Sequence, residues 1–335
     1  MGVVVLGMHR SGTSAAARVI NLLGVPFGRG RLVPITDANP AGHWESWELQ
    51  DVNNDLLDAF GGSWAGPPVL SDGWELDVRA VRLEAAGVRA WNMVHPEEPW
   101  VWKDPRTCLT LPFWRRIAPL EGPAIIIYRH PDEVAASLSR RDGFSSAVAL
   151  ALWERYNRDA LLAVQGWPVL VMPYDRLAND AVGWAGDVRS FLTDHGIRQD
   201  ATVSAADAAG EVRGELRHRR TEGALEMSAP QRRLLEALAE VDGPHTRFVP
   251  PQLGEPSPWL GPLLVEHGRA YRQEMVLRSE LARARSQMGT VINRTRVKVL
   301  AYKAYQHVVH RDAPHANHRP SPDPSPTDPA VSTGQ

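Results

Sequence analysis

The sequence predicts an α/β fold in which helices cover both faces of a mainly parallel central sheet. Short apolar runs rich in β-branched residues alternate with longer Ala/Leu-rich or amphipathic stretches between residues 1 and 197. This alternation favours βαβ units, because a crossover helix joins each parallel strand to the next. A glycine-rich turn also joins the first apolar run to the first helical pattern, as in three-layer folds that bind ligands at strand ends.

Each expected element follows from its local pattern and its flanking residues. Gly7 ends the first apolar run, Gly24 and Pro26 stop the first helical pattern, and Gly196 ends the last one. Pro131 is well placed for the first turn of a helix. The expected strands are residues 3–6, 100–102, 124–128 and 169–172. The expected helices are residues 15–23, 133–141, 145–164 and 179–195, with a short one near 51–60 inside a loop-rich region, 28–74.

The chain is expected to have three parts: a catalytic-type domain over residues 1–255, a basic helical appendage over 256–311, and a disordered Pro-rich tail over 312–335. The segment 291–311 contains no acidic residue and mixes Arg and Lys with Val, Leu and Tyr. Such a helix either packs on the domain or on a partner chain, or makes peripheral contact with an anionic membrane surface. The oligomeric state stays open.

Composition narrows the function classes. The 37 basic and 39 acidic residues give a net charge of −2, so we expect no nucleic-acid partner. Cys108 is the only cysteine, which rules out an intrachain disulfide and a thiolate zinc cluster and suits a reducing compartment. The N-terminus has no signal-peptide pattern, and no apolar stretch is long enough for a membrane span. We therefore expect a cytoplasmic protein.

The segment Gly7–Ser14, with the sequence GMHRSGTS, predicts a P-loop-type phosphate site. Its glycines let the backbone wrap closely around an anion, with loop and helix amides pointing inward. His9, Arg10, Ser11, Gly12, Thr13 and Ser14 are the expected ligands. Position 13, where a Walker A loop has its lysine, is Thr13, and the cation is Arg10 instead. An arginine-bearing loop suits one phosphate that carries a leaving bond better than a nucleoside triphosphate with magnesium.

A second anion site is expected where the strand 124–128 ends. Arg129 precedes the next helix and Ser137 follows it by eight positions. Ligands gather at the carboxyl ends of parallel strands, so Arg129 should share an edge with Arg10. Two separated cationic sites on one edge suit a nucleotide phosphorylated at both its 5′ and its 3′ positions.

These segments resemble the sulfotransferase family that uses 3′-phosphoadenosine-5′-phosphosulfate. Gly7–Ser14 is similar to that family's 5′-phosphosulfate loop in the arginine form of bacterial and carbohydrate-acting members, and Arg129 with Ser137 to its 3′-phosphate pair. Trp102-Lys-Asp-Pro-Arg106 also resembles a segment of the bacterial members. The resemblance covers roughly residues 1–250. It implies transfer of a sulfuryl group from this co-substrate, without a required metal, to a hydroxyl of a carbohydrate, glycolipid or glycosylated metabolite.

The chain departs from the family members that modify small phenols and steroids. Their loop carries a lysine, and a histidine base stands two residues beyond a strand-end lysine, where this chain has Pro105 after Lys103. Members closer to this chain use a glutamate shortly after the loop helix, which implies Glu45 as the base that takes the acceptor's proton. Glu48, His43 and Asp104 are the alternatives.

The expected catalytic residues are therefore Glu45, Arg10 and Lys103. Arg10 and Lys103 would bind the 5′-phosphate and the sulfuryl oxygens. Asp104 and Arg106 would order the site by contacting the residues that bind the ligand. A basic cluster at 217–220 would either close over the nucleotide or face solvent. Two other functions stay open: a P-loop kinase or phosphotransferase, with Asp104 as a candidate magnesium ligand, and a non-catalytic nucleotide-binding relative.

Overall fold

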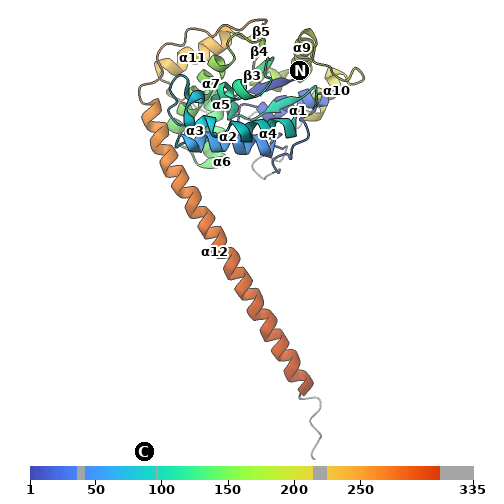
Figure 1. The fold of residues 1–335 in the computed structure, drawn as a ribbon, viewed down its shortest axis with the longest axis vertical. Coiled ribbons are helices and arrows are strands. Elements are labelled where there is room, and N and C mark those ends of the chain that lie inside the picture. Colours follow the sequence, from blue (N-terminus) through green and yellow to red (C-terminus); the bar gives the residue numbers. More distant parts are fainter. Residues whose placement is uncertain (36–41, 96, 214–224, 310–335) are drawn as a thin grey trace, which may run out of the picture. The chain divides into compact units, whose positions relative to one another are not determined.

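A computed structural model describes residues 1–35, 42–95, 97–213 and 225–309. The chain forms two compact units, Met1–Glu274 and Met275–Gln335, which we describe separately. The first unit contains a central sheet surrounded by helices (Figure 1). The expected tail at 312–335 and the basic cluster at 217–220 lie outside the described residues.

The sheet has five strands in the order β2-β1-β3-β4-β5. The parallel strands are β1 (Val3–Leu6), β2 (Val101–Lys103), β3 (Ala124–Tyr128) and β4 (Val169–Pro173). The last strand, β5 (Gly243–His245), pairs antiparallel with β4 at one edge. All four expected strands are present, and the mainly parallel α/β sheet is confirmed.

The helices are α1 (Thr13–Leu22), α2 (Trp47–Ala59), α3 (Val78–Val81), α4 (Glu84–Val94), α5 (Thr107–Ile117), α6 (Pro131–Asp142), α7 (Ser146–Ala163), α8 (Tyr174–Asn179), α9 (Ala181–Asp194), α10 (Ala205–Arg213), α11 (Ala229–Glu240) and α12 (Leu260–Val309), with a 3₁₀ turn η1 (Trp74–Leu76).

Successive strand residues face two different cores, which shows why the apolar runs are continuous. Val4 and Ile126 join a core formed with α2, α4, α5 and α7, whereas Val5 and Ile125 join a core formed with α1, α8, α9 and α10. Both faces of the sheet are therefore covered by helices, as expected.

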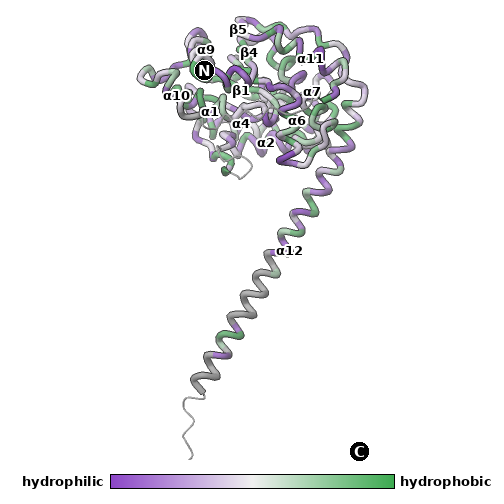
Figure 2. The backbone as a smooth tube through the Cα atoms, turned by 180° about the vertical axis from the view of Figure 1, so that it is seen from behind, coloured by the Kyte–Doolittle hydropathy of each residue, from purple (hydrophilic) through white to green (hydrophobic). Residues whose placement is uncertain are grey.

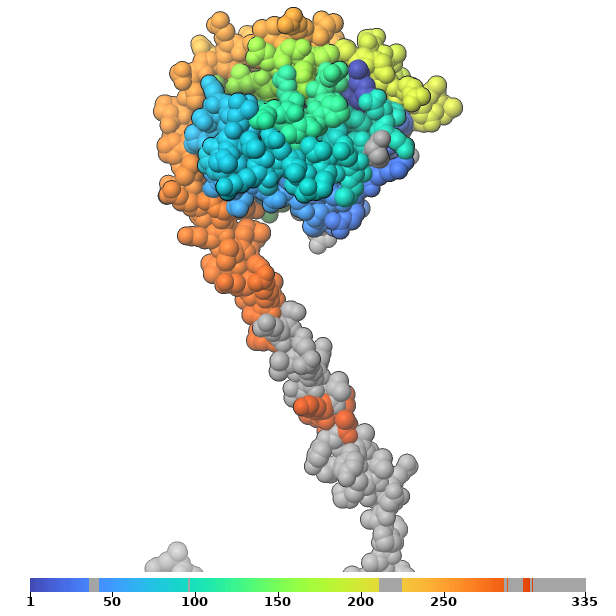
Figure 3. Space-filling view, in the orientation of Figure 1, coloured from blue at the N-terminus to red at the C-terminus, as the bar shows by residue number. Residues whose placement is uncertain are grey.

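Several elements differ from the sequence-based expectation. The helix expected over 179–195 is present as α9, and a short helix that was not expected, α8, precedes it. The two are separated at Asp180, whose side chain caps α9 by accepting the Gly183 N–H at 2.9 Å. The short helix near 51–60 begins already at Trp47, with Ser46 as its N-cap. Helices α4 and α5 were not expected, although together with α2 and α3 they cover one face of the first unit (Figures 1 and 3).

The first unit continues beyond residue 255 into the start of α12. Leu260 and Leu264 are buried in the core of this unit, and Tyr271 packs against it. In the part of α12 that Figure 2 colours, hydrophilic and hydrophobic residues are interspersed. Among the described residues, no helix is both long and apolar enough to cross a membrane.

Candidate functional site

The turn between β1 and α1 is built around two glycines that no other residue could replace without strain. Gly12 has φ 91°, and a Cβ there would lie 2.2 Å from the Tyr174 ring. A Cβ on Gly7 would lie 2.3 Å from the carbonyl oxygen of Ile127 on β3. The backbone closes tightly, with the Ser11 N–H donating to the Met8 carbonyl at 3.1 Å. The loop therefore adopts its path because glycine alone fits at both ends.

The loop presents a polar side chain that is unpaired within the described part of the chain. Ser11 is fully buried, yet its hydroxyl has no hydrogen-bond partner among the residues that the structure describes. The first turn of α1 carries no acidic residue, and no side chain of the described residues caps its N-terminus. Buried polar groups in native proteins are normally paired, and a helix N-terminus attracts negative charge. This end of the loop is therefore suited to an anion.

His9 belongs to the loop, and its ring packs against Trp64 and Tyr156 with centroid distances of 4.6 and 5.6 Å. Burial, followed by the charges of Arg106 and Arg141, holds the pKa of His9 well below its ordinary value of 6.5. The imidazole is therefore neutral at pH 7. Its Nε2 atom is buried without a partner in the described part of the chain.

Arg10, Arg129 and Ser137 form one group, although the sequence suggested two separated cationic sites. The Nε atom of Arg10 donates to the Ser137 hydroxyl at 2.8 Å. Arg129 donates from Nη1 to the Arg10 carbonyl at 3.3 Å, which braces the unusual φ of 70° at Arg10. Its Nε atom pairs with Glu133 at 2.6 Å, and its guanidinium lies 4.4 Å from the centre of the Tyr174 ring.

Positive charge is crowded around Arg10. Burial is the largest cause of its lowered pKa, and the neighbouring charges of Arg141 and Arg129 lower it further. Like charges held this closely repel one another, so an anion bound among them would relieve the repulsion. The group can therefore hold a phosphate or sulfate.

Lys103 connects the loop to the candidate base. It stands at the end of β2 with its side chain buried, and its Nζ atom lies 2.6 Å from Glu45 Oε1 and 3.2 Å from Ser14 Oγ. Ser14 in turn donates to the His43 carbonyl at 3.2 Å. The neighbouring Thr13 is buried at the start of α1. The structure thus brings Lys103, Glu45 and the loop together, although Glu45 and Lys103 are 58 positions apart in the chain.

Glu45 is a buried carboxylate held by several hydrogen-bond donors. Its Oε2 atom accepts from Gln50 Nε2 at 2.6 Å and from Arg106 Nη1 at 3.4 Å. Burial by itself would raise the pKa of Glu45, but the charges of Lys103 and Arg106 outweigh it and leave the pKa below its ordinary value. Glu45 is therefore ionised at neutral pH, as a proton acceptor must be.

The other candidate bases occupy different surroundings. Glu48 accepts from Arg31 and from Ser46 at the start of α2; burial opposes its ionisation, but these hydrogen bonds outweigh it and lower the pKa of Glu48. Asp104 is buried with both oxygens occupied, one by the Arg106 backbone N–H and guanidinium at 2.9 Å each, the other by Asn53 at 2.8 Å. Its carboxylate therefore orders the site rather than facing a ligand.

His43 is half-buried beside Glu45. Burial lowers its pKa, and the charge of Lys103 lowers it further against the opposing effect of Glu45. His43 thus stays a neutral neighbour of the carboxylate at pH 7.

Two residues of α2 belong to the site without having been singled out from the sequence. Gln50 donates a hydrogen bond to Glu45. Asn53 donates one to Asp104 and accepts hydrogen bonds from Thr110 and Trp114 at 2.6 and 2.8 Å. Positions 50 and 53 share one face of a helix because they are three residues apart. That spacing, next to the expected base, was the signal available in the sequence.

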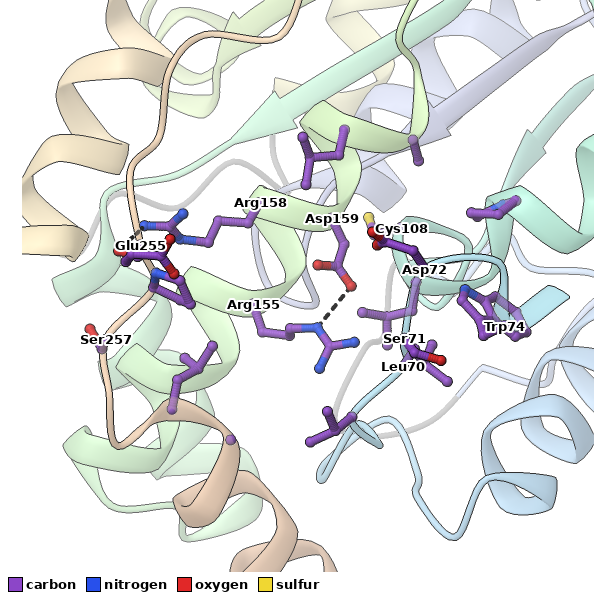
Figure 4. A pocket seen from close by; sticks show the side chains of 18 of the residues that line it. Leu70, Ser71, Asp72, Trp74, Cys108, Arg155, Arg158, Asp159, Glu255 and Ser257 are labelled. Carbon is purple, nitrogen blue, oxygen red and sulfur yellow. Dashed lines mark hydrogen bonds and ion pairs between the residues drawn. The ribbon is translucent and has the colours of Figure 1, made fainter. Parts of the chain in front are cut away.

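A separate cavity of about 1050 Å³ lies between α5, α7 and the segments 69–75 and 254–262 (Figure 4). Arg155 and Asp159 form an ion pair at 2.8 Å along α7, on one wall of the cavity. Arg158 pairs with Glu154 and donates to backbone carbonyls of residues 253–255. Cys108 forms part of its wall and accepts the Gly7 N–H at 3.2 Å. None of the expected site residues lines this cavity.

Comparison with known proteins adds no assignment. The chain matches no protein-family model, and a search of curated proteins found no match.

Proposed function

We propose that this chain is a sulfotransferase with a P-loop-type fold, which transfers a sulfuryl group from 3′-phosphoadenosine-5′-phosphosulfate to an acceptor hydroxyl. The observation that carries the proposal is the position of Lys103. One buried ammonium contacts both a hydroxyl of the glycine loop and an ionised carboxylate, at 3.2 and 2.6 Å. This arrangement suits a reaction in which an anionic donor and a hydroxyl nucleophile meet.

The residues of the loop would bind the donor's 5′ end. The amides at the start of α1, the Ser11 hydroxyl, which is unpaired among the described residues, and Arg10 offer donors to phosphate and sulfate oxygens. Arg129 and Ser137 adjoin Arg10 and would hold the 3′-phosphate. Two phosphates of one nucleotide lie close enough to share such a continuous group of cations.

Glu45 would act as the base. The acceptor's O–H bond breaks as its oxygen bonds to sulfur, and the proton passes to the carboxylate. The bond between sulfur and the bridging oxygen breaks, and Lys103 and Arg10 would stabilise the charge that develops on the leaving phosphate. When Lys103 turns toward the donor, Glu45 loses its nearest cation and becomes a stronger base.

The acceptor that we propose is a hydroxyl of a carbohydrate, glycolipid or glycosylated metabolite. This part of the proposal follows from the arginine-type loop and the glutamate base, and a panel of sugars is the first set to test. A single cysteine suits the reducing cytoplasm, where we place the enzyme.

The kinase alternative is less well supported by the geometry. Thr13 occupies the position of the Walker lysine, and the oxygens of Asp104 are engaged by Arg106 and Asn53. A magnesium ligand would need a carboxylate with a free oxygen. The proposed sulfuryl transfer needs no metal.

Nucleotide binding tests the proposal directly. Adenosine 3′,5′-bisphosphate at 100 times its Kd should stabilise the protein by about 2.7 kcal/mol without metal, whereas ATP with magnesium should not. Incubation with sulfur-labelled donor and a sugar panel should then label a product. If calorimetry shows no uptake of the bisphosphate by the folded protein, or if ATP with magnesium binds in its place, the proposal is wrong.

A further inference from the structure

The second unit carries a row of exposed apolar side chains on one face of α12. Leu277, Leu281 and Met288 are 64%, 50% and 58% exposed, and Ala284 between them is exposed as well. Their spacings are four, three and four residues, so they share one face of the helix. Exposed apolar rows of this length on a helix indicate a surface that binds another molecule.

The same spacing continues along the sequence to the end of α12. Eight of the ten positions that follow the alternating three-and-four pattern are apolar or aromatic, with Thr295 and Lys298 as the exceptions. The ten positions are Leu277, Leu281, Ala284, Met288, Val291, Thr295, Lys298, Tyr302, Tyr305 and Val309. A repeat with an average period of 3.5 residues, kept over more than four heptads, is typical of a coiled coil.

We propose that this row of residues, 277–309, pairs with the same row of a second copy of this chain in a parallel two-stranded coiled coil. In heptad notation Leu277 is at position d and Leu281 at position a. The acidic Glu280 then occupies position g, which in a parallel pair faces the next position e of the other copy. That position is Arg285, so each dimer gains two opposite-charge pairs.

The remaining charges fit the same arrangement. The three later g–e′ pairs are Gln287 with Ile292, Arg294 with Val299, and Ala301 with Gln306, and none places two like charges together. Arg283, Arg296 and Lys303 fall on outward positions c and b, where solvent screens them. Lys298 at position d weakens the seam locally and helps fix its register.

A second copy explains these features better than a membrane surface does. A helix lying on anionic lipid gains from basic residues on the flanks of its apolar face, irrespective of where the acids stand. Here the one acidic residue of the segment 275–309 lies at the position that faces a cation in a parallel dimer. Lipid binding is therefore the competing outcome in the tests below.

Cysteine cross-linking tests both the pairing and its direction. Cys108 is buried, so the chain offers no competing accessible thiol among the described residues. In Ala284→Cys, the two d-position thiols face each other in a parallel dimer, and mild oxidation should give a covalent dimer in high yield. The matched control Ala282→Cys is at outward position b and should stay largely monomeric on a non-reducing gel. Equal yields from the two variants would overturn the proposal.

Sedimentation of the full-length protein tests the seam itself. The wild-type chain should be a dimer and Leu281→Asp a monomer, while Ala282→Asp should remain a dimer. The charge reversal Glu280→Arg should raise the dimer Kd about tenfold, and adding Arg285→Glu to it should restore the wild-type value. The coiled coil is refuted if the wild-type protein is a monomer at about 50 μM, or if Leu281→Asp is still a dimer. It is also refuted if the protein binds phosphatidylserine vesicles as a monomer.

These tests are independent of the enzymatic proposal. The first unit of Leu281→Asp should unfold at the same Tm as that of the wild-type protein, which shows that it is folded. Loss of dimerisation with this Tm retained thus reports on the helix alone.

Discussion

Replacing Glu45 with glutamine tests the proposed base and the buried ion pair together. The change keeps the side chain's size but removes its charge, which leaves the Lys103 ammonium, 1% exposed, facing a neutral amide. The new NH₂ group must face either Lys103 or Arg106, and both can only donate. Breaking a buried pair usually costs about 3–5 kcal/mol, and Lys103 keeps Ser14 as a partner. We therefore expect a loss of about 3 kcal/mol, or roughly 5–10 °C in Tm.

The effect on turnover should be larger than this stability loss can explain. A positioned base contributes a factor of about 10²–10⁴, so kcat of Glu45→Gln should fall at least about a hundredfold at a temperature where the variant is fully folded. Affinity for adenosine 3′,5′-bisphosphate should be unchanged, because Arg10, Arg129 and Ser137 remain in place. Steady-state kinetics and calorimetry on the same preparation separate the two effects.

The pH profile distinguishes a base from a merely structural carboxylate. The pKa of Glu45 is lowered in the free enzyme, so in the wild-type protein kcat/KM should hold at neutral pH and fall only as the pH drops below its ordinary value of 4.5. The ion pair's contribution to stability has the same sign: it is present above pH 4.5 and is lost as the pH falls through the lower folded-state pKa. In Glu45→Gln both acid-side effects should disappear.

Glu48→Gln is the matched control, because it is the same substitution three residues away. The Glu48 side chain contacts Arg31 and Ser46 instead of the site. It should keep kcat within about twofold, well below the effect of a lost base. Turnover of Glu45→Gln within about threefold of the wild-type value, or an equally slow Glu48→Gln, would refute the reasoning.

Three further predictions concern the loop and its surroundings. Gly12→Ala should lower the free energy of unfolding by at least about 2 kcal/mol, because the new Cβ would meet the Tyr174 ring at 2.2 Å. Gly143 also has a positive φ, but a Cβ there would meet no described atom within 4 Å, so Gly143→Ala should lower it by about 1 kcal/mol. Equal losses would show that the clash is relieved by movement. Ser137→Ala should weaken binding of adenosine 3′,5′-bisphosphate about 10- to 100-fold by calorimetry, with the exposed Ser139→Ala as an unaffected control. Cys108 is 1% exposed, and burial raises the pKa of its thiol to about 12. It should therefore not react with a thiol reagent until the protein is unfolded. Rapid labelling of the native protein at pH 7 would contradict its buried position.

The sequence alone determined the strands and the helices that carry strong local patterns. β1, β3 and β4 are β-branched runs bounded by glycine or proline, and α6 and α7 follow clear start positions at Pro131 and Ser145. These elements were predictable because burial on both faces of a parallel sheet requires uninterrupted apolar residues. Helix α5 was missed because Pro112 interrupts its pattern, and β5 because three residues, Gly-Pro-His, carry no strand pattern.

The position of the loop and the order of the candidate site residues were also set by the sequence, since glycine spacing and strand ends are local features. Only the tertiary structure decided which of these residues touch. It paired Lys103 with Glu45 and placed Arg10 against Ser137. It also brought Gln50 and Asn53 within hydrogen-bond distance of the carboxylates of Glu45 and Asp104. The physical reason is that these contacts join side chains from separate elements. Their distances depend on how the helices pack on the sheet, and no local pattern encodes that packing.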